Sequence, residues 1–328
     1  MLITSTRTCD ISQAYGLIVG CAILWAGGCA SDTQSGVKYE HQNGWQWQGI
    51  VGRQLHTEHY SLHTTLSDQG VVDRLAQVME AAYRQYVRLV PGIHRSPRKL
   101  PLFVFQTYDQ WVEYTQATTG KDSSAYLSVL NGGYTIGDRF VCWVSNEHDV
   151  RTTAAHEGWH QFVSVHFKMR LPPTIEEGLA CTFENVLVRP EGVFFDRTHN
   201  LRRQRALRDA VEGDYLIPLE TLILLHAGDL RDRSQAVREG YYGQAWALVV
   251  MLETRPAYRE GFLRMLQAVA SGNTRVDVGH NDASQVYYPS RIKTFLQHYL
   301  IDDWSRFEQD YVSFVREKAR IREPGERP

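Results

Sequence analysis

Apolar residues recur at helical spacing in most long stretches of this chain. In residues 71–89 they fall at intervals of three and four, which predicts an amphipathic helix that ends before Pro91. Residues 108–118 predict a second, shorter helix. Beyond Pro190 nearly all the patterns are helical. Six further helices are predicted there, over 200–211, 218–226, 242–253, 258–270, 290–300 and 304–319.

Strand patterns are confined to the first half of the chain. Residues 45–65 alternate between apolar and polar positions, which predicts one or two strands, and residues 102–105 form a short apolar strand. Residues 125–144 have the pattern of a hairpin, with glycine turns at 131–133 and 137–138. The expected fold class is therefore α+β, with a mixed α/β half followed by a mostly helical half.

One more helix is expected near the join of these halves. Asn146 and Asp149 are both good N-caps, so the helix begins near one of them. It runs to about Met169 and stops before Pro172 and Pro173, because proline cannot continue a helix. This helix carries the most informative residues of the chain.

The first 29 residues have the pattern of an export segment. Their apolar run, residues 14–26, is shorter than the roughly 20 residues that a membrane-spanning helix needs. Small residues then lead to Cys29, and this arrangement resembles the lipoprotein box of bacterial proteins. The resemblance implies a lipid on Cys29 and a membrane-anchored location in the bacterial cell envelope. A cleaved signal without lipid and an uncleaved anchor are the alternatives.

The rest of the chain divides into three parts. Residues 30–44 are polar and predict a tether, residues 45–190 form the α/β half, and residues 191–328 form a helical half that completes a cleft. The 328 residues are 43% hydrophobic and 22% charged, which is typical of a globular protein. A net charge of −2 gives no electrostatic reason to expect nucleic acid as a partner.

His156-Glu157-Gly158-Trp159-His160 is the strongest chemical pattern in the chain. Residues four apart lie about 40° apart around a helix, so His156 and His160 point the same way, one turn apart. Two imidazoles in that position can bind one metal ion, and Glu157 lies close enough to reach a water on it. The pattern predicts one Zn²⁺ per chain, with the two histidines as ligands and Glu157 as the group that handles protons.

A catalytic zinc ion needs a third protein ligand, and the sequence offers two candidates. His166 has the spacing of the metzincin pattern, but Val163 stands where that pattern needs a glycine to turn the chain. On an unbroken helix His166 lies about 120° around from His160 and faces away. The other candidate is Glu177, which a second helix packing back across the first would aim at the ion. Glu177 has an alternative role, as the capping-box partner of Thr174.

These residues resemble the gluzincin zinc metallopeptidases, most closely their aminopeptidase branch. The resemblance is carried by residues 156–162 (HEGWHQF), 177–180 (EGLA) and 242–253 (YGQAWALVVMLE). It implies a zincin-like fold with Glu177 as the third zinc ligand, and with Glu184 in a supporting role behind the ligands. It also implies that Tyr242 stabilises an oxyanion. Tyr241, the preceding residue, is another candidate for that role. The alternative is that Tyr242 is a core tyrosine without a catalytic role.

The resemblance implies hydrolysis of peptide bonds in a peptide or protein substrate. The aminopeptidases carry a Gly-x-Met-Glu-Asn strand whose Glu binds the free amine of the substrate, and residues 125–145 contain no match to it. We therefore expect an endopeptidase, with an extended peptide lying along residues 132–144 by β-augmentation. Two alternatives remain: a non-catalytic, surface-tethered binding protein on the same scaffold, and a metal-dependent hydrolase of a non-peptide bond. The order of the segments also resembles a group of uncharacterised bacterial peptidase-like proteins, which implies no particular substrate.

Cys142 and Cys181 are the two cysteines of the expected folded part. They flank the HExxH helix in sequence, so they can pair in an oxidising compartment. Two buried free thiols are the alternative.

Overall fold

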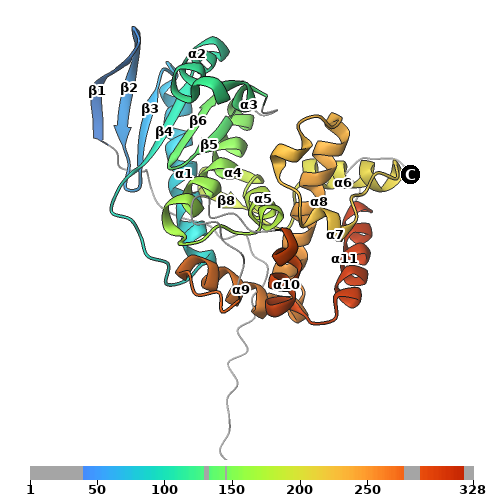
Figure 1. Ribbon diagram of the computed structural model, residues 1–328. Helices are drawn as coiled ribbons and strands as arrows, with labels where there is room; N and C mark the ends of the chain where they lie inside the picture. The colour runs from blue at the N-terminus through green and yellow to red at the C-terminus, as the bar shows by residue number, and fades with distance from the viewer. Residues whose placement is uncertain (1–39, 129–132, 145, 277–288, 321–328) are drawn as a thin grey trace, which may run out of the picture.

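The computed structural model describes residues 40–128, 133–144, 146–276 and 289–320. The expected export segment with Cys29, and the tether as far as residue 39, lie outside these described residues. The described chain forms one part built on a β-sheet and one part built of helices, and the two stand side by side (Figure 1). The α+β class is therefore confirmed. No helix within the described ranges is both long and apolar enough to span a bilayer.

The larger sheet of the described chain has six strands in the order β1-β2-β3-β4-β6-β5. Their bounds are β1 (Glu40–Trp47), β2 (Ile50–His56), β3 (Tyr60–Thr64), β4 (Leu100–Phe105), β5 (Gly133–Ile136) and β6 (Arg139–Trp143). β1, β2 and β3 form an antiparallel meander, while β3, β4 and β6 run parallel to one another. β5 is antiparallel to β6 and forms one edge of the sheet.

Three strands form where the alternating pattern predicted one or two. Gly49, with φ of +85°, lies in the turn between β1 and β2, a backbone conformation that favours glycine. β1 begins at Glu40, within the residues expected to form the tether. The predicted hairpin of β5 and β6 is confirmed, with Gly137 at φ +58° in its turn. The other predicted turn, at 131–133, falls mainly outside the described residues.

The predicted helices are confirmed, with differences at their ends. Their bounds, with three short additions, are α1 (Gln69–Leu89), α2 (Tyr108–Thr119), η1 (Gly120–Asp122), α3 (Ser123–Leu127), α4 (Glu147–His166), α5 (Pro173–Thr182), α6 (Leu201–Glu212), α7 (Leu219–Leu222), η2 (Ala227–Leu230), α8 (Gln235–Thr254), α9 (Pro256–Ser271), α10 (Pro289–Leu300) and α11 (Trp304–Ala319). Asn146 is the N-cap of α4, and its side chain accepts a hydrogen bond from the amide of Asp149. α4 ends at His166, before the predicted Met169, and α8 begins well before the predicted Tyr242.

A small hairpin interrupts the helical pattern after α5. β7 (Val186–Arg189) and β8 (Gly192–Phe195) pair antiparallel, although no strand was expected beyond Pro190. Gly192 has φ of +141° at the start of the second strand, where an L-side chain would be strained. The hairpin therefore lies before the first of the helices predicted beyond Pro190, in a segment for which no element was predicted.

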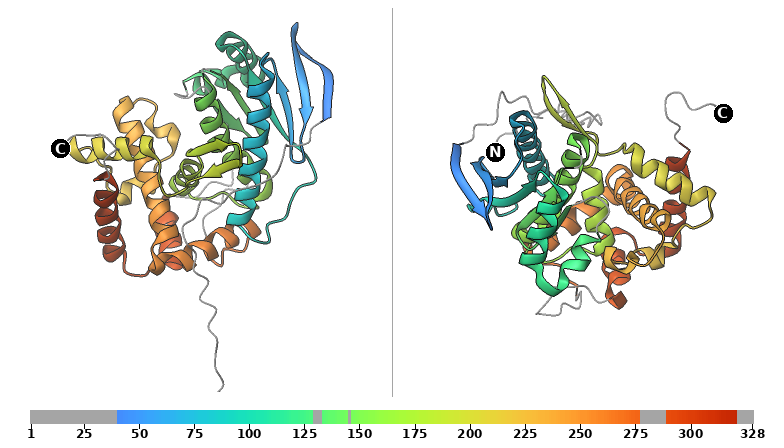
Figure 2. Two further views of the ribbon diagram at one scale, coloured as in Figure 1. Left: turned by 180° about the vertical axis from the view of Figure 1, so that it is seen from behind. Right: turned by 90° about the horizontal axis from the view of Figure 1, so that it is seen from above.

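The two faces of the sheet are covered by different helices. Along β6, Phe140 and Cys142 belong to the main core, whereas Val141 between them packs in a second cluster with Tyr114 of α2. This alternation follows from the pleat of a strand. α2 therefore covers one face, while α1 and α4 pack together over the other, which Figure 2 shows from behind.

α8 is the central helix of the second part. Nearly every residue from Tyr241 to Leu252 is buried, and the helix packs against α5, α6, α9 and α11. α5 also packs against α4. The two parts of the molecule therefore meet along α4, α5 and α8. The predicted site residues within the described chain lie on these three helices, except Glu184, which follows the end of α5.

Candidate metal centre

α4 brings His156 and His160 together. The two residues are one helical turn apart, and their Nε2 atoms lie 3.3 Å from each other. Both side chains are mostly buried, at 12% and 15% exposed. The prediction that the two rings point the same way is confirmed.

α5 carries the third member of this cluster. The chain bends after α4, and α5 packs back across it. This brings Oε2 of Glu177 to 3.4 Å from Nε2 of His156 and 3.5 Å from Nε2 of His160. Gly178 permits the close packing of α5 on α8, because a Cβ there would lie only 2.3 Å from the backbone oxygen of Ala245. The fold therefore brings a carboxylate to the histidine pair.

The capping role considered for Glu177 is not observed. The N-cap of α5 is Pro172, and no side-chain hydrogen bond caps this helix. Thr174 instead donates its hydroxyl proton to the carbonyl of Leu222, 2.5 Å away and 48 residues on in sequence. The predicted capping box is therefore wrong, because a long-range acceptor takes the hydroxyl. Oε2 of Glu177 is buried and has no hydrogen-bond partner.

The three clustered atoms fit a zinc ion. Tetrahedral zinc with bonds of about 2.0–2.1 Å separates neighbouring ligand atoms by about 3.3 Å. The three separations here are 3.3, 3.4 and 3.5 Å. Two imidazole nitrogens and one carboxylate oxygen are also a donor set that catalytic zinc sites use. A zinc ion at this position would give the buried, unpaired Oε2 of Glu177 a partner.

Each histidine is held through its other ring nitrogen. Nδ1 of His156 lies 2.9 Å from Oε1 of Glu184, and Nδ1 of His160 lies 3.0 Å from Oε1 of Glu176. A carboxylate in this position keeps the proton on Nδ1 and leaves Nε2 free for a metal. Sequence reasoning singled out Glu184 but missed Glu176. The available signal was that Glu176 stands beside a proposed ligand.

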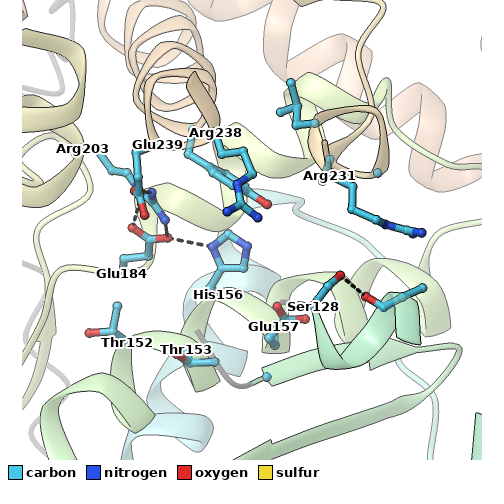
Figure 3. A pocket seen from close by; sticks show the side chains of 16 residues that line it. Ser128, Thr152, Thr153, His156, Glu157, Glu184, Arg203, Arg231, Arg238 and Glu239 are labelled. Carbon is cyan, nitrogen blue, oxygen red and sulfur yellow. Dashed lines mark hydrogen bonds and ion pairs between the residues drawn. The ribbon is translucent and has the colours of Figure 1, made fainter. Parts of the chain in front are cut away.

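Glu184 is itself held by α6 and its N-cap residue. Arg203, 1% exposed, donates from Nε to Oε2 at 2.8 Å and from Nη2 to Oε1 at 2.6 Å. Asn200 donates to Oε2 at 2.8 Å. Nη1 of Arg203 continues to Oε2 of Glu239 at 2.8 Å, so a chain of pairs runs from His156 to α8 (Figure 3). Sequence reasoning missed Arg203 and Glu239, because neither stands in a recognisable pattern.

The cluster favours positive charge at its centre. Burial is the largest influence on the pKa of His160 and acts to lower it, but the carboxylates of Glu177 and Glu176 prevail and raise this pKa to about 10. The pKa of His156 is also raised against burial, by contacts with Cys181 and two nearby carboxylates. Burial acts to raise the pKa of Glu177, but the two imidazoles hold it well below its usual range. Protons on the imidazoles, or a metal ion between them, would balance the negative charge of these carboxylates.

His156 of this cluster lines a cavity between the two parts of the molecule. One wall is formed by α4, with His156 and Glu157, and by the edge strand β5 at Gly133. The opposite wall includes Arg238 of α8 (Figure 3). Tyr242, on the same helix, also lines the cavity. Glu157 therefore faces the same space as His156.

Tyr242, and not Tyr241, faces this cavity. Its ring centroid lies 6.2 Å from that of His156, and the guanidinium of Arg203 lies 4.9 Å from its centre. Tyr241 is buried and donates its hydroxyl proton to the carbonyl of Leu225 at 3.2 Å. Tyr242 lies inside α8 rather than at a helix start, which corrects the sequence-based placement.

His166 lies away from the histidine pair. It is buried, with Nε2 3.2 Å from the hydroxyl of Tyr83 on α1 and Nδ1 3.2 Å from the carbonyl oxygen of His94. α4 continues unbroken through Val163 to His166, so the ring faces away as predicted. Of the two candidate third ligands, the structure places only Glu177 beside the pair.

Cys142 and Cys181 are both free and buried, so the alternative of two buried thiols is confirmed. Cys181 lies close enough to His156 and Glu184 for the three to hold a cation. However, Glu184 is already occupied by a buried guanidinium, and burial raises the pKa of the Cys181 thiol. A metal binds the thiolate and not the thiol, so this group is a poorer candidate.

Another group within the described ranges, formed by Glu58, His59 and Glu80, also lies close enough to hold a cation. Its buried carboxylate, Glu80, already accepts hydrogen bonds from Thr57 and from both the backbone amide and the ring of His59. Within the described residues, no buried ligand atom of this group lacks a hydrogen-bond partner. These contacts tie the turn between β2 and β3 to α1 and need no ion.

Comparisons of the chain with protein-family models, with curated proteins and with solved structures find no match. What the site can do is therefore judged from its own atoms.

Proposed function

We propose that this protein is a zinc-dependent peptidase of the gluzincin type, acting as an endopeptidase on the envelope side of a bacterial membrane. The observation that carries the proposal is the triangle of Nε2, Nε2 and Oε2 from His156, His160 and Glu177, with sides of 3.3–3.5 Å. The ring nitrogens that point away from it are held by carboxylates, and its carboxylate oxygen lacks a partner. The sheet, α4 and α5 support a zincin-like fold.

The three triangle residues would hold the zinc ion, which supplies a water acidic enough to ionise near pH 7. Glu157 follows His156 on α4 and lines the same cavity. Its carboxylate takes the proton of the attacking water and passes it to the nitrogen of the leaving amine. This transfer needs a carboxyl group that faces the cavity, which Glu157 provides.

Tyr242 is the proposed donor to the oxyanion. Burial is the main cause that raises the pKa of the Tyr242 hydroxyl, and the negative charge of Glu177 raises this pKa further. The hydroxyl therefore keeps its proton at neutral pH and can donate a hydrogen bond as negative charge develops on the peptide carbonyl. Interactions of this kind contribute about 3–4 kcal/mol in other enzymes.

The edge strand β5 is the proposed support for an extended substrate. β5 lies at the rim of the sheet, and Gly133 lines the cavity. The hydroxyl of Thr135 donates to the carbonyl of Glu157 at 2.9 Å, which ties the strand to α4. A peptide adding to this edge by β-augmentation would place its backbone beside the proposed zinc site.

Zinc analysis and peptide digestion of matched variants test the proposal. The protein should contain one zinc per chain and cleave members of a mixed peptide library. Glu157→Gln should keep the zinc and cleave at least about 100-fold more slowly, because only the proton transfer is removed. Glu177→Ala should lose both zinc and cleavage. Glu58→Gln, in the other cation-sized group, is the matched control and should change neither.

The outcomes separate the candidate functions. One tightly held zinc with no cleavage of any peptide would contradict a peptidase and favour the binding protein. Cleavage that survives Glu157→Gln unchanged would refute the role of Glu157. Zinc retained in full after Glu177→Ala would refute the ligand set.

A further inference from the structure

The cavity wall opposite α4 carries two guanidiniums that have no acidic partner among the described residues. The lining includes three acidic side chains, Glu157, Glu184 and Glu239. Two of them are already paired, because Arg203 holds Glu184 and also shares Glu239 with another arginine. Arg231 and Arg238 line the same cavity, and no side chain in the described part of the chain forms an ion pair with either.

Arg238 is the more constrained of the two. Its Nε is buried and has no hydrogen-bond partner in the part of the chain that the structure describes, although a guanidinium donor normally has one. Figure 3 shows its guanidinium reaching from α8 into the cavity above His156, while Arg231 projects from the end of η2 elsewhere on the cavity lining. Arg231 is exposed at the mouth of the cavity. The wall therefore presents a positive field and at least one buried donor without an acceptor.

Arg238 also stands at a defined distance from the proposed chemistry. It lies four residues before Tyr242 on α8, so both side chains project from the same face of the helix, about 6 Å apart. An extended peptide advances about 3.3 Å per residue. A group bound by Arg238 would therefore lie one or two residues from a carbonyl that Tyr242 contacts.

We propose that Arg238, assisted by Arg231, binds a carboxylate of the substrate one or two residues from the scissile bond. This inference rests on the proposed function and names its substrate class, peptides that present a carboxylate at that place. A planar guanidinium matches a carboxylate through two parallel hydrogen bonds, and the partly buried setting strengthens them. The carboxylate comes either from an Asp or Glu side chain or from the C-terminus of a short peptide.

Binding to a form that does not turn over tests this proposal. Zinc-loaded Glu157→Gln protein is titrated calorimetrically with N-terminally blocked, alanine-based hexapeptides. One series carries Asp or Asn at each position in turn, and a second pair ends in a free carboxylate or an amide. At least one acidic member should bind about tenfold or more tightly than its neutral twin. The series in which this difference occurs identifies the source of the carboxylate.

Arginine variants in the same background assign the effect. Arg238→Gln should remove the preference for the acidic twin, Arg231→Gln should reduce it, and both should keep zinc and the melting temperature. Arg233→Gln, an arginine outside the cavity, is the matched control and should keep the preference. Equal binding of all acidic and neutral twins would overturn the proposal. So would a preference that survives Arg238→Gln.

These experiments distinguish failure of the carboxylate site from failure of the peptidase proposal. If acidic peptides bind through Arg238 but wild-type protein cleaves nothing, the carboxylate site stands and hydrolysis fails. If wild-type protein cleaves peptides but acidic and neutral twins bind equally, hydrolysis stands and the carboxylate site fails.

Discussion

The guanidinium of Arg203 meets the carboxylate of Glu184 side by side, with Nε 2.8 Å from Oε2 and Nη2 2.6 Å from Oε1. Glu184 then accepts a hydrogen bond from Nδ1 of His156 at 2.9 Å. Arg203 and Glu184 are both buried, so water cannot replace either partner. Paired contacts of this kind are geometrically specific as well as strong. Arg203 therefore fixes the orientation of a proposed ligand without touching the ion.

Arg203→Met is expected to lower the free energy of unfolding by about 3–5 kcal/mol, because it leaves Glu184 as an uncompensated buried charge. Arg203→Lys keeps a positive charge but loses the two parallel hydrogen bonds of the guanidinium, so the decrease in the free energy of unfolding should be smaller. Both variants should bind zinc at least about tenfold more weakly, because the ring of His156 is no longer held. Urea denaturation of the metal-free protein and competition with a zinc-binding dye measure the two effects.

The matched control is Arg202→Met. Arg202 also pairs with Glu239, but its side chain is 45% exposed, so its removal should cost less than about 1 kcal/mol. Equal stability and equal zinc affinity of the Arg202→Met and Arg203→Met proteins would contradict the positioning role.

Glu176 is expected to orient the second histidine in the same way. Glu176→Ala removes the acceptor for Nδ1 of His160 and should weaken zinc binding by about 10–100-fold. Glu176→Gln keeps an oxygen that can accept the hydrogen bond and should restore most of the affinity. The zinc dissociation constant of each variant checks this ordering. An alanine variant that binds zinc as tightly as the glutamine variant would show that Glu176 does not position the ring.

Local sequence patterns were sufficient to predict the histidine pair. His156 and His160 follow from a four-residue spacing on a helix whose N-cap, Asn146, was correctly anticipated. The bend that returns Glu177 follows from two consecutive prolines. Each of these features depends on residues close together in the chain, where propensity and spacing carry most of the information.

Long-range contacts were not predictable from single residues. Thr174 has the sequence of a capping residue, yet its hydroxyl bonds to Leu222, which only the packed fold brings near. The start of α8 was missed because Arg238, Glu239 and Gly240 interrupt the apolar pattern of its first two turns, although Ser234 is a standard N-cap there. Arg203 and Glu239 stand on different helices, and nothing in either segment indicates that they pair.

Gly178→Ala is expected to disturb the site through packing alone. Its Cβ would lie 2.3 Å from the carbonyl oxygen of Ala245 and 2.6 Å from a methyl group of Val249, so α5 must shift away from α8. We expect a loss of about 1–2 kcal/mol in the free energy of unfolding, since overpacking outweighs the gain in helix propensity. Zinc affinity should fall as well, because Glu177 precedes the shifted residue.

Gly70→Ala provides the control for this substitution. The nearest atom to its added Cβ belongs to the guanidinium of Arg74, at 3.0 Å, and this flexible side chain can move. Its stability and zinc affinity should stay close to those of the wild type. If Gly178→Ala behaves like Gly70→Ala in both measurements, the close approach of α5 and α8 does not position Glu177.

The buried His166 should make the metal-free protein sensitive to mild acid. Burial lowers the pKa of His166 to about 4, whereas the unfolded chain has a histidine pKa of about 6.5. Between these two pH values the imidazole is protonated in the unfolded state but not in the folded state. The free energy of unfolding therefore falls as the pH drops from 6.5 to 4, and this residue causes no further fall below pH 4. With an allowance for partial solvent screening, His166 contributes about 2 kcal/mol to this fall in the free energy of unfolding.

His166→Gln should therefore reduce the acid-induced fall in the free energy of unfolding by about 2 kcal/mol, measured by urea denaturation with a chelator present. His148→Gln, at an exposed position of the same helix, should keep the wild-type pH dependence. Identical pH dependence in the wild type and His166→Gln would show that this ring takes up its proton freely in the folded protein.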